Sequence, residues 1–331
     1  MKAVVVTEFG SPEALDKIGE VSAPTAGDGE VVVDIHAAGL NFADLLVVEG
    51  KYQSLPELPF VPGKEVVGEV TSVGPGMSRV KVGDRVLAFV ESGGFADQTV
   101  AAEQDCHFIP DEMSFRDAVS LGLNFQTSYF ALVDRAGVKS GETVLVTGAS
   151  GGVGLAGVQI AKALGATVFA GIANPDKRVL VESAGADQVI DLAAADLKSS
   201  LRDHVYAVTE GKGVDVILDP VGGDVFDAGL RALAWRGRIV VIGFVEGRIS
   251  EIAANYLLLK NISAVGMYLD SYRKHDPEWV VRIQAEIYDM WKAGHLKAPA
   301  VDAYPLEGFA EAAGALAGRR AQGRILLAPK E

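Results

Sequence analysis

Residues Glu142–Gly171 read ETVLVTGASGGVGLAGVQIAKALGATVFAG and carry the clearest structural signal in the chain. The β-branched run Thr143–Thr147 predicts a strand, and the apolar spacing of Val153–Leu164 predicts a helix. The glycine-rich turn between them, Gly148–Gly154, has the pattern A-x-G-x-x-G, whose glycines let backbone N–H groups approach a pyrophosphate and let the helix pack on the strand. A turn without a ligand is the weaker alternative, because the strand and the helix are the context that the motif requires. The segment therefore predicts a dinucleotide-binding unit whose helix N-terminus faces the anion.

Strands and helices alternate downstream of this unit. Asn174 is placed to cap a helix that begins at Pro175, where the missing N–H costs nothing. The further predicted strands are Thr167–Gly171, Gln188–Asp191, Val214–Asp219 and Arg238–Gly243, and the later predicted helices are Ala194–Val208 and Asp224–Ala234. Alternation at these lengths is typical of parallel βαβ units, so we predict an α/β protein with a doubly wound Rossmann sheet.

The chain on either side of this region lacks the regular alternation of strands and helices. Short β-segments punctuated by Gly and Pro predict a compact antiparallel barrel or sandwich; they are Ala3–Thr7, Glu30–Ala37, Glu65–Val73 and Arg85–Val90. After Gly243 the pattern indicates a strand, a long amphipathic helix and a closing strand, at Asn261–Leu269, Glu278–Ala293 and Gly323–Pro329. We therefore predict a discontinuous β-rich domain, residues 1–124 and 255–331, that carries the nucleotide-binding domain, residues 125–254, as an insertion.

Composition limits the classes of function. The 331 residues are 49% apolar and 22% charged, which is typical of a soluble globular protein. The net charge of −14 argues against a nucleic-acid partner, because phosphate contacts depend on Lys and Arg. The single cysteine, Cys106, excludes an intramolecular disulfide and a multi-cysteine zinc site. Because the sequence has neither a signal-peptide pattern nor a membrane-spanning run, we expect a cytoplasmic protein without a membrane partner.

The end of the second nucleotide-domain strand indicates which dinucleotide binds. A site for NAD has an Asp or Glu there to hold the ribose 2′-hydroxyl, whereas this chain reads VFAGIANPDKR. Asp176 follows, but as the second residue of a helix it is explained by the helix dipole. Lys177 or Arg178 could pair with a 2′-phosphate, although each could equally be solvated helix surface. The sequence thus favours NADPH as the cofactor.

Motifs along nearly the whole chain resemble those of one enzyme family. The stretches are AAGLNFADLLVVEGKY, VPGKEVVGEV, GASGGVG, GVDVILDPVGG, GRIVVIGF and QGRILLAP. Together they resemble the zinc-independent quinone oxidoreductase branch, which includes zeta-crystallin, of the medium-chain dehydrogenase/reductase superfamily. The resemblance implies a GroES-like catalytic domain, a Rossmann domain, NADPH in the cleft between them, and a homodimer or a tetramer, of which we expect the homodimer.

The resemblance also implies roles for individual residues. Asn41 and Tyr52 would face the substrate. The cofactor-binding residues would be Thr127 near the nicotinamide; Gly151, Gly152, Val153 and Gly154 at the pyrophosphate; Lys177 at the 2′-phosphate; Phe244 and Val245 at the nicotinamide ribose; and Arg324 near the phosphates. We add Ser150, in the same turn, and Arg178, which follows Lys177, as further cofactor-binding candidates. Leu192 departs from the family pattern, which often has a Tyr there near the adenine ribose phosphate, and this weakens the NADPH prediction without reversing it.

The stretch FVPGKEVVGEV, Phe60–Val70, has Lys64 where zinc alcohol dehydrogenases have a His ligand. The other two ligand positions hold Asn41 and Asn124. A protonated Lys has no lone pair, and amide side chains are poor zinc ligands. We therefore expect no metal. Without a Lewis acid, deprotonating an alcohol is difficult, whereas a conjugated carbonyl accepts a hydride readily.

The leading hypothesis is an enzyme that transfers a hydride from nicotinamide C4 of NADPH to a quinone. The Asn41 amide and the Tyr52 hydroxyl could donate to the developing oxyanion, and Tyr52 or water could return the proton. Asn41 could instead cap a helix beginning at Phe42, and Tyr52 could be a loop aromatic, while Asp44 is expected to be structural and Glu65 to pair with a cation. The alternatives are a reductase of enones or enoyl compounds (2-alkenals or enoyl thioesters), and an NADPH-binding structural or RNA-associated protein of the zeta-crystallin type.

Overall fold

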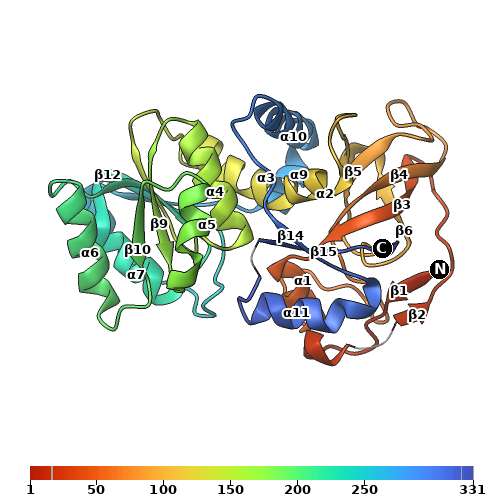
Figure 1. Ribbon diagram of the computed structural model, residues 1–331, viewed down its shortest axis with the longest axis horizontal. Helices are drawn as coiled ribbons and strands as arrows, with labels where there is room; N and C mark the ends of the chain where they lie inside the picture. Colours follow the sequence, from red (N-terminus) through yellow and green to blue (C-terminus); the bar gives the residue numbers. More distant parts are fainter. Residues whose placement is uncertain (16–17, 322, 331) are drawn as a thin grey trace. The chain divides into compact units, whose positions relative to one another are not determined.

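The computed structural model describes residues 1–15, 18–321 and 323–330, and the chain folds into two compact units (Figure 1). Unit 1 comprises Met1–Leu123, Arg273–Asp289 and Ala298–Glu331. Unit 2 comprises Asn124–Tyr272 and Met290–Lys297. Unit 2 thus extends past residue 254, the boundary predicted from the sequence, and the order of its strands explains this difference.

Unit 2 is built on a parallel six-stranded sheet of order β10-β9-β8-β11-β12-β13 among the described residues. Its strands are β8 (Thr143–Val146), β9 (Thr167–Ile172), β10 (Gln188–Asp191), β11 (Val214–Asp219), β12 (Leu233–Val241) and β13 (Ser263–Gly266). Its helices are η3 (Phe130–Arg135), α4 (Gly152–Ala163), η4 (Pro175–Lys177), α5 (Arg178–Ser183), α6 (Leu197–Val208), α7 (Gly223–Ala232) and α8 (Ala254–Lys260). Figure 1 shows α4 and α5 on one face of the sheet and α6 and α7 on the other, so the predicted doubly wound sheet is confirmed.

The region after β12 differs from the sequence prediction. The predicted strand Asn261–Leu269 is shorter in the structure, because β13 covers Ser263–Gly266 and a helix, α9 (Leu269–His275), begins at its predicted last residue. Since β13 pairs with β12 in parallel register, this segment completes the sheet of unit 2. The return to unit 1 therefore comes at Arg273 and not near residue 255.

Unit 1 is β-rich, as predicted. Its main sheet has the order β14-β15-β3-β4-β5-β7, with β6 also paired to β3. β1 (Lys2–Val4) and β2 (Ile18–Glu20) form a separate two-stranded sheet. The strands of the main sheet are β3 (Glu30–Gly39), β4 (Glu65–Val73), β5 (Arg85–Phe89), β6 (Gln98–Ala102), β7 (Cys106–Phe108), β14 (Val301–Tyr304) and β15 (Arg324–Leu327). The helices are η1 (Pro12–Ala14), α1 (Phe42–Val48), η2 (Glu103–Asp105), α2 (Phe115–Ser120), η5 (Leu306–Gly308) and α11 (Phe309–Ala317), and the helices whose ranges cross a unit boundary are α3 (Leu123–Tyr129), α9 and α10 (Pro277–Lys292).

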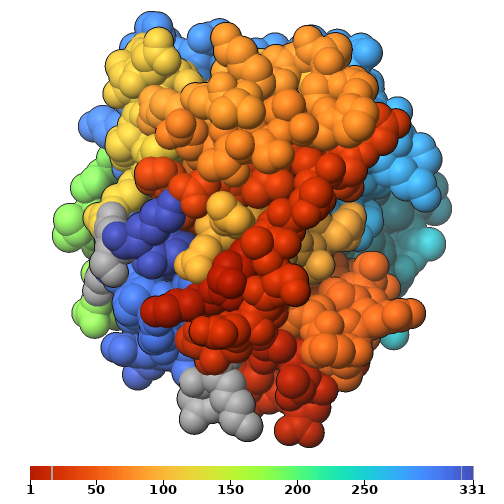
Figure 2. Space-filling model, turned by 90° about the vertical axis from the view of Figure 1, so that its right-hand side faces the viewer, coloured from red at the N-terminus to blue at the C-terminus, as the bar shows by residue number. Residues whose placement is uncertain are grey.

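The closing strand of unit 1 joins distant parts of the chain. β15 pairs antiparallel with β3, and β14 pairs in parallel with β15. Figure 2 shows N-terminal segments, in red, and C-terminal segments, in dark blue, on the same face. Lys2, near the N-terminus, also forms an ion pair with Glu307. The predicted discontinuous domain follows from this strand pairing, because β15, with β14 beside it, adds to a sheet whose strands β3, β4, β5, β6 and β7 come from the first third of the chain.

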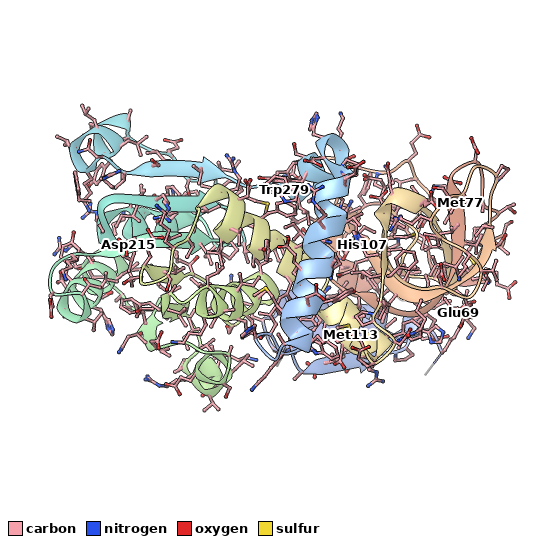
Figure 3. All side chains as sticks on the ribbon, turned by 90° about the horizontal axis from the view of Figure 1, so that it is seen from above. Glu69, Met77, His107, Met113, Asp215 and Trp279 are labelled. Atoms are coloured by element: carbon pink, nitrogen blue, oxygen red, sulfur yellow. The ribbon has the colours of Figure 1, made fainter. Side chains whose placement is uncertain are left out.

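Buried β-branched residues fill the interior of both units. In unit 1, Val31, Val33 and Ile35 of β3 contribute to a core with Phe95 and Phe309. In unit 2, polar bonds also tie the strands together. Asp215, labelled in Figure 3, accepts a hydrogen bond from the Thr143 backbone N–H at 2.8 Å, which links β11 to the start of β8. The central strands that carry the glycine-rich turn are therefore held in register from both sides.

Candidate functional site

The glycine-rich turn of unit 2 leads from β8 into α4. Gly148 has a φ of +57°, and the Gly151 N–H donates to the Gly148 carbonyl at 2.9 Å to close the turn. A Cβ on Gly154 would overlap the Gly148 carbonyl oxygen and would lie 2.7 Å from Ala149 Cα, so only glycine permits this approach of helix to turn. The first N–H groups of α4 lack acceptors within the helix and carry its positive dipole end. The turn therefore presents backbone donors of the kind that bind a pyrophosphate, and binding of the cofactor at this turn stays a prediction.

Asp219, at the end of β11, organises the neighbouring turn. Its carboxylate accepts hydrogen bonds from the Thr147 hydroxyl at 2.5 Å and from the backbone N–H groups of Val221 at 3.2 Å and Gly222 at 3.2 Å. Burial raises the pKa of Asp219 above its ordinary value. The network joins the carboxyl ends of the central strands β8 and β11, and doubly wound folds bind their ligands at the carboxyl ends of the strands. Sequence reasoning gave Asp219 and Thr147 no role, although Asp219 lies in the GVDVILDPVGG stretch that it singled out.

The residues predicted to flank the nicotinamide lie in unit 2. Thr127, on α3, is buried, whereas Phe244, in the loop after β12, is partly exposed. Phe244 lies against the Asp219 turn, because a Cβ on Gly222 would come within 3.1 Å of the Phe244 ring. The Val245 N–H donates to the Pro220 carbonyl at 3.4 Å. The loops that carry Phe244 and Val245 and the turn after β11 are thus packed together; the roles of these residues at the cofactor stay predictions.

The region predicted to hold the 2′-phosphate begins directly after β9. The predicted cap is confirmed, since the Asn174 side chain accepts a hydrogen bond from the Asp176 N–H at 2.9 Å. Lys177, in η4, is buried, while Arg178 is exposed and pairs with Glu182 at 2.8 Å. Leu192 packs against Gly171, where a Cβ would lie 2.9 Å from the leucine. Lys177 thus lies at the carboxyl end of β9, where a 2′-phosphate is expected, and the phosphate contact itself stays a prediction.

A buried polar cluster occupies unit 1. Glu65, the first residue of β4, accepts hydrogen bonds from the Leu123 N–H at 2.5 Å and the Asn41 amide at 3.3 Å, and forms an ion pair with Arg324. The Arg324 guanidinium also donates to Asn41 Oδ1 at 2.8 Å and to the Leu40 carbonyl at 3.0 Å. The prediction that Glu65 pairs with a cation is confirmed. Arg324, predicted to approach the cofactor phosphates, is almost fully buried within unit 1, and a phosphate contact stays a prediction.

Asn41 joins this cluster to α1. It occupies the position before the first helical residue, Phe42, as the capping alternative predicted, and its backbone N–H donates to Asp44 Oδ2 at 2.8 Å. Its side-chain N–H groups donate to the Gly39 carbonyl at 3.2 Å and to Glu65. An amide nitrogen carries two hydrogens, so both have acceptors inside unit 1. The predicted donation from Asn41 to a substrate oxygen would require one of these bonds to be given up.

Asp44 has a structural role, as expected, because its carboxylate accepts the Asn41 N–H in the capping box at the start of α1. Its second oxygen, Oδ1, is buried without a hydrogen-bond partner among the described residues. Burial, opposed by the Asn41 N–H and by the positive charges of Lys64 and Arg324, raises the pKa of Asp44 to about 7. The carboxyl group therefore changes its charge near neutral pH.

Tyr52 and Lys64 lie together in unit 1. The Lys64 Nζ is 5.3 Å from the centroid of the Tyr52 ring, which is a cation–π geometry. Lys64 directly precedes β4, and its side chain is 8% exposed. The structure thus brings Asn41, Asp44, Tyr52 and Lys64 into the same region of unit 1, because Asn41 bonds Asp44 and the charge of Lys64 acts on Asp44.

The residues at the zinc-ligand positions do not suit a metal ion. Asn41 is bonded within the Glu65 cluster, Lys64 carries an ammonium group, and Asn124 lies against Gly152 in unit 2. His107 (Figure 3) is buried edge-on to Phe89 at 5.2 Å, and burial lowers its pKa to about 3. Over residues 1–15, 18–321 and 323–330 no group of three or more His, Cys, Asp or Glu side chains is arranged to hold a metal. Zinc therefore does not fit these residues.

Comparison with known proteins adds an independent line of evidence. Residues 27–111 match the family model described as alcohol dehydrogenase GroES-like domain, and residues 152–285 match the one described as zinc-binding dehydrogenase. The chain is 37% identical to a quinone oxidoreductase-like protein 2 homolog of Nematostella vectensis, over 100% of this chain and 89% of the relative.

Solved structures agree with these matches over the full length. A mycobacterial protein in complex with NADPH is 32% identical, with a TM-score of 0.93 over 99% of this chain and 100% of the other. The quinone oxidoreductase of Escherichia coli, also in complex with NADPH, is 29% identical, with a TM-score of 0.91 over 99% and 100%. The chain belongs to the quinone oxidoreductase family of the medium-chain dehydrogenase/reductase superfamily, as its motifs predicted, and its two units are a GroES-like domain and a Rossmann domain.

Proposed function

We propose that the protein reduces quinones with NADPH, by hydride transfer and without a metal ion. The observation that carries this proposal is the glycine-rich turn before α4, followed by a second strand, β9, that ends without the carboxylate expected for NAD. The zinc-ligand positions, which hold two amides and an ammonium group, support an acceptor that needs no Lewis acid. The NADPH complexes of the mycobacterial and Escherichia coli relatives support the choice of cofactor.

Bound NADPH would supply a hydride from C4 of its nicotinamide. Ser150, Gly151, Gly152, Val153 and Gly154 would hold the pyrophosphate through backbone donors at the start of α4. Lys177 would pair with the 2′-phosphate, and Arg178, whose bond to Glu182 is at the surface, would add positive charge nearby. Thr127, Phe244 and Val245 would line the nicotinamide and its ribose, and Arg324 would add to the positive potential near the phosphates.

The acceptor would lie against the region of unit 1 that contains Asn41 and Tyr52. Arg324 and Glu65 fix the orientation of the Asn41 amide by bonding both its oxygen and its nitrogen. Tyr52 presents a phenol, which can return a proton to the reduced acceptor directly or through water. Donation from Asn41 to the acceptor would require one of its two N–H bonds within unit 1 to be given up, whereas the Tyr52 phenol would help to position the acceptor.

We further propose that the protein is a cytoplasmic homodimer. β13 is an edge strand, since it pairs with β12 alone in the described chain. Leu258 and Leu259 of α8 are each 76% exposed, and Trp235 of β12 is 70% exposed. An unpaired strand edge beside exposed large apolar side chains suits pairing with a second copy across a two-fold axis. The one cysteine, Cys106, is buried and unpaired, which accords with a reducing compartment.

The function is tested by following the oxidation of NADPH and NADH with a quinone, an enone, an aldehyde or no acceptor, with and without a chelator. We expect turnover with the quinone, faster with NADPH than with NADH and unchanged by the chelator. A Lys177→Met variant should lose the preference for NADPH, because the 2′-phosphate loses its cation. Arg231→Met, a substitution on α7, is the matched control.

Each other outcome has a distinct meaning. Loss of turnover with chelator would contradict the metal-free mechanism, and equal rates with the two cofactors would contradict the role of Lys177. Preference for the enone over the quinone would favour an enone or enoyl reductase. NADPH binding without turnover of any acceptor would favour the structural or RNA-associated alternative.

A further inference from the structure

Lys64 is a buried lysine, and filling the space around its side chain does not require a charged group. Its side chain is 8% exposed, and its Nζ donates to the Glu91 carbonyl at 3.3 Å. The Glu91 carboxylate lies 3.7 Å away but is itself 86% exposed, so solvent weakens this ion pair. An apolar side chain of the same length could fill the same space without the desolvation penalty of an ammonium group.

The Lys64 ammonium group has N–H groups that are not used in hydrogen bonds within the described part of the chain. It carries three N–H groups, and its one hydrogen bond within the described part of the chain goes to the Glu91 carbonyl. The Tyr52 ring, 5.3 Å from Nζ, stabilises the positive charge without accepting a conventional hydrogen bond. Buried polar groups in native proteins are usually satisfied, so a buried cation with unused donors suggests a further partner.

The polar groups near Lys64 in unit 1 already have hydrogen-bond or ion-pair partners within the unit. Both N–H groups of Asn41 donate within unit 1, and the Arg324 guanidinium is engaged by Glu65, Asn41 and the Leu40 carbonyl. Asp44 is an acceptor of the Asn41 N–H and brings no positive charge. Arg324 is neutralised by the buried Glu65, although its Nε also lacks a partner among the described residues. Lys64 differs because its ion-pair partner, Glu91, is exposed to solvent and its ammonium group keeps unused N–H groups.

We propose that Lys64 is a catalytic residue that donates a hydrogen bond to the acceptor oxygen on which negative charge develops. This inference rests on the proposed function. The quinone takes up the hydride released as the C4–H bond of NADPH breaks, so the nicotinamide is oxidised and the quinone is reduced by two electrons. One acceptor oxygen then carries the negative charge, and Lys64 stabilises it while keeping its own proton. A proton from Tyr52 or water completes the hydroquinone, and water reprotonates Tyr52 where Tyr52 is the donor.

The first test compares the kinetics of Lys64→Met and Lys64→Arg with those of Lys51→Met. Lys51 is an exposed lysine of unit 1 that pairs with Glu49, so its removal changes the net charge equally. We expect kcat with the quinone to fall about 100-fold in Lys64→Met, the usual effect of losing one oxyanion donor. The Kd for NADPH should be unchanged, Lys64→Arg should recover part of the rate, and Lys51→Met should resemble wild type.

The second test needs no turnover. The probe is 4-nitrophenol, whose phenolate resembles a hydroquinone anion and absorbs differently from the neutral phenol. Wild-type protein should lower the pKa of the bound phenol by about 1 unit or more, as an adjacent cation does. Lys64→Met should abolish this shift, and Lys51→Met should keep it. If Lys64→Met does not fold, Lys64→Gln replaces it, and the wild-type shift can be measured in any case.

The two tests separate this inference from the proposed function. An unshifted bound phenol in wild type, no binding of the phenol, or an equal shift in Lys64→Met would overturn the role of Lys64. So would a Lys64→Met variant that reduces the quinone at the wild-type rate. If wild type lowers the pKa of the phenol through Lys64 but reduces no quinone, the anion-stabilising role of Lys64 holds and the quinone reductase proposal fails.

Discussion

The capping position of Asp44 can be recognised in the sequence, whereas its raised pKa cannot. Its place three residues after Asn41 is a capping spacing, and in the structure the Asp44 carboxylate accepts a hydrogen bond from the Asn41 N–H, an interaction that the sequence analysis did not specify. The burial of Asp44 cannot be read from the sequence, because it depends on α11 and the β-sheet that pack around α1. The same holds for Glu65, whose expected cation turned out to be Arg324, 259 positions away in the chain.

The raised pKa of Asp44 predicts a dependence of stability on pH. The folded-state pKa of about 7 lies above the ordinary value of 3.8, so between these values the folded protein holds a proton that the unfolded chain has lost. Stability is therefore highest below about pH 4 as far as Asp44 is concerned, and it falls as the pH rises toward 7. Asp44→Asn removes this titration while keeping an acceptor for the Asn41 N–H.

We expect the free energy of unfolding of wild type, relative to that of Asp44→Asn, to fall by about 2–3 kcal/mol between pH 5 and pH 8. Urea unfolding of both proteins across this range measures the difference, and other titrating groups cancel in the comparison. A difference that stays constant with pH would contradict the assignment to Asp44.

At the scale of the element, β8, its turn and α4 were foreseen closely. The predicted strand Thr143–Thr147 and helix Val153–Leu164 correspond to Thr143–Val146 and Gly152–Ala163. Local signals suffice here, because apolar periodicity and glycines act within a few residues. β13 was predicted too long, because the apolar run from Asn261 does not reveal that the strand ends at Gly266 and that another helix, α9, begins at Leu269.

Two alanine substitutions separate the structural from the proposed binding role of these glycines. In Gly154→Ala the new Cβ would overlap backbone atoms of the turn, so we expect the apo-protein to lose about 1–3 kcal/mol of stability. In Gly151→Ala the nearest atom lies 3.3 Å away and the φ of −83° suits alanine, so the stability should change by less than about 1 kcal/mol. The NADPH affinity, however, should fall in both variants.

Thermal or urea unfolding of the apo-proteins and NADPH titration by fluorescence provide the two readouts. A Gly154→Ala protein as stable as wild type would show that the turn can relax. Unchanged NADPH affinity in Gly151→Ala would count against a pyrophosphate at this turn.

At the scale of the whole molecule, the two units each close around their own core. Unit 2 is nearly continuous in sequence, whereas unit 1 is assembled from three segments. Among the described residues no helix is both long and apolar enough to span a membrane. The exposed leucines of α8 and the free edge of β13 are among the surface features that unit 2 leaves without an intramolecular partner in the described structure.

The proposed dimer is tested at these leucines. We expect wild type to sediment as a dimer at micromolar concentration and the double variant Leu258→Ser, Leu259→Ser to shift toward the monomer, because the apolar area buried between copies is lost. Val179→Ser, which alters another exposed apolar residue of unit 2, is the control. A monomeric wild type, or a double variant that sediments like wild type, would contradict the proposed interface.

The sequence by itself determined the family, the Rossmann and β-rich units and the glycine-rich turn, because these depend on periodicity and on residues close together in the chain. It also identified Lys64 as a departure from a zinc site. Only the tertiary structure decided that Glu65 pairs with Arg324, that both N–H groups of Asn41 are engaged, that Asp44 titrates near neutral pH and that β13 belongs to the parallel sheet. These features depend on burial and on partners brought together from distant segments, and a charge or a hydrogen bond takes its energy from that environment.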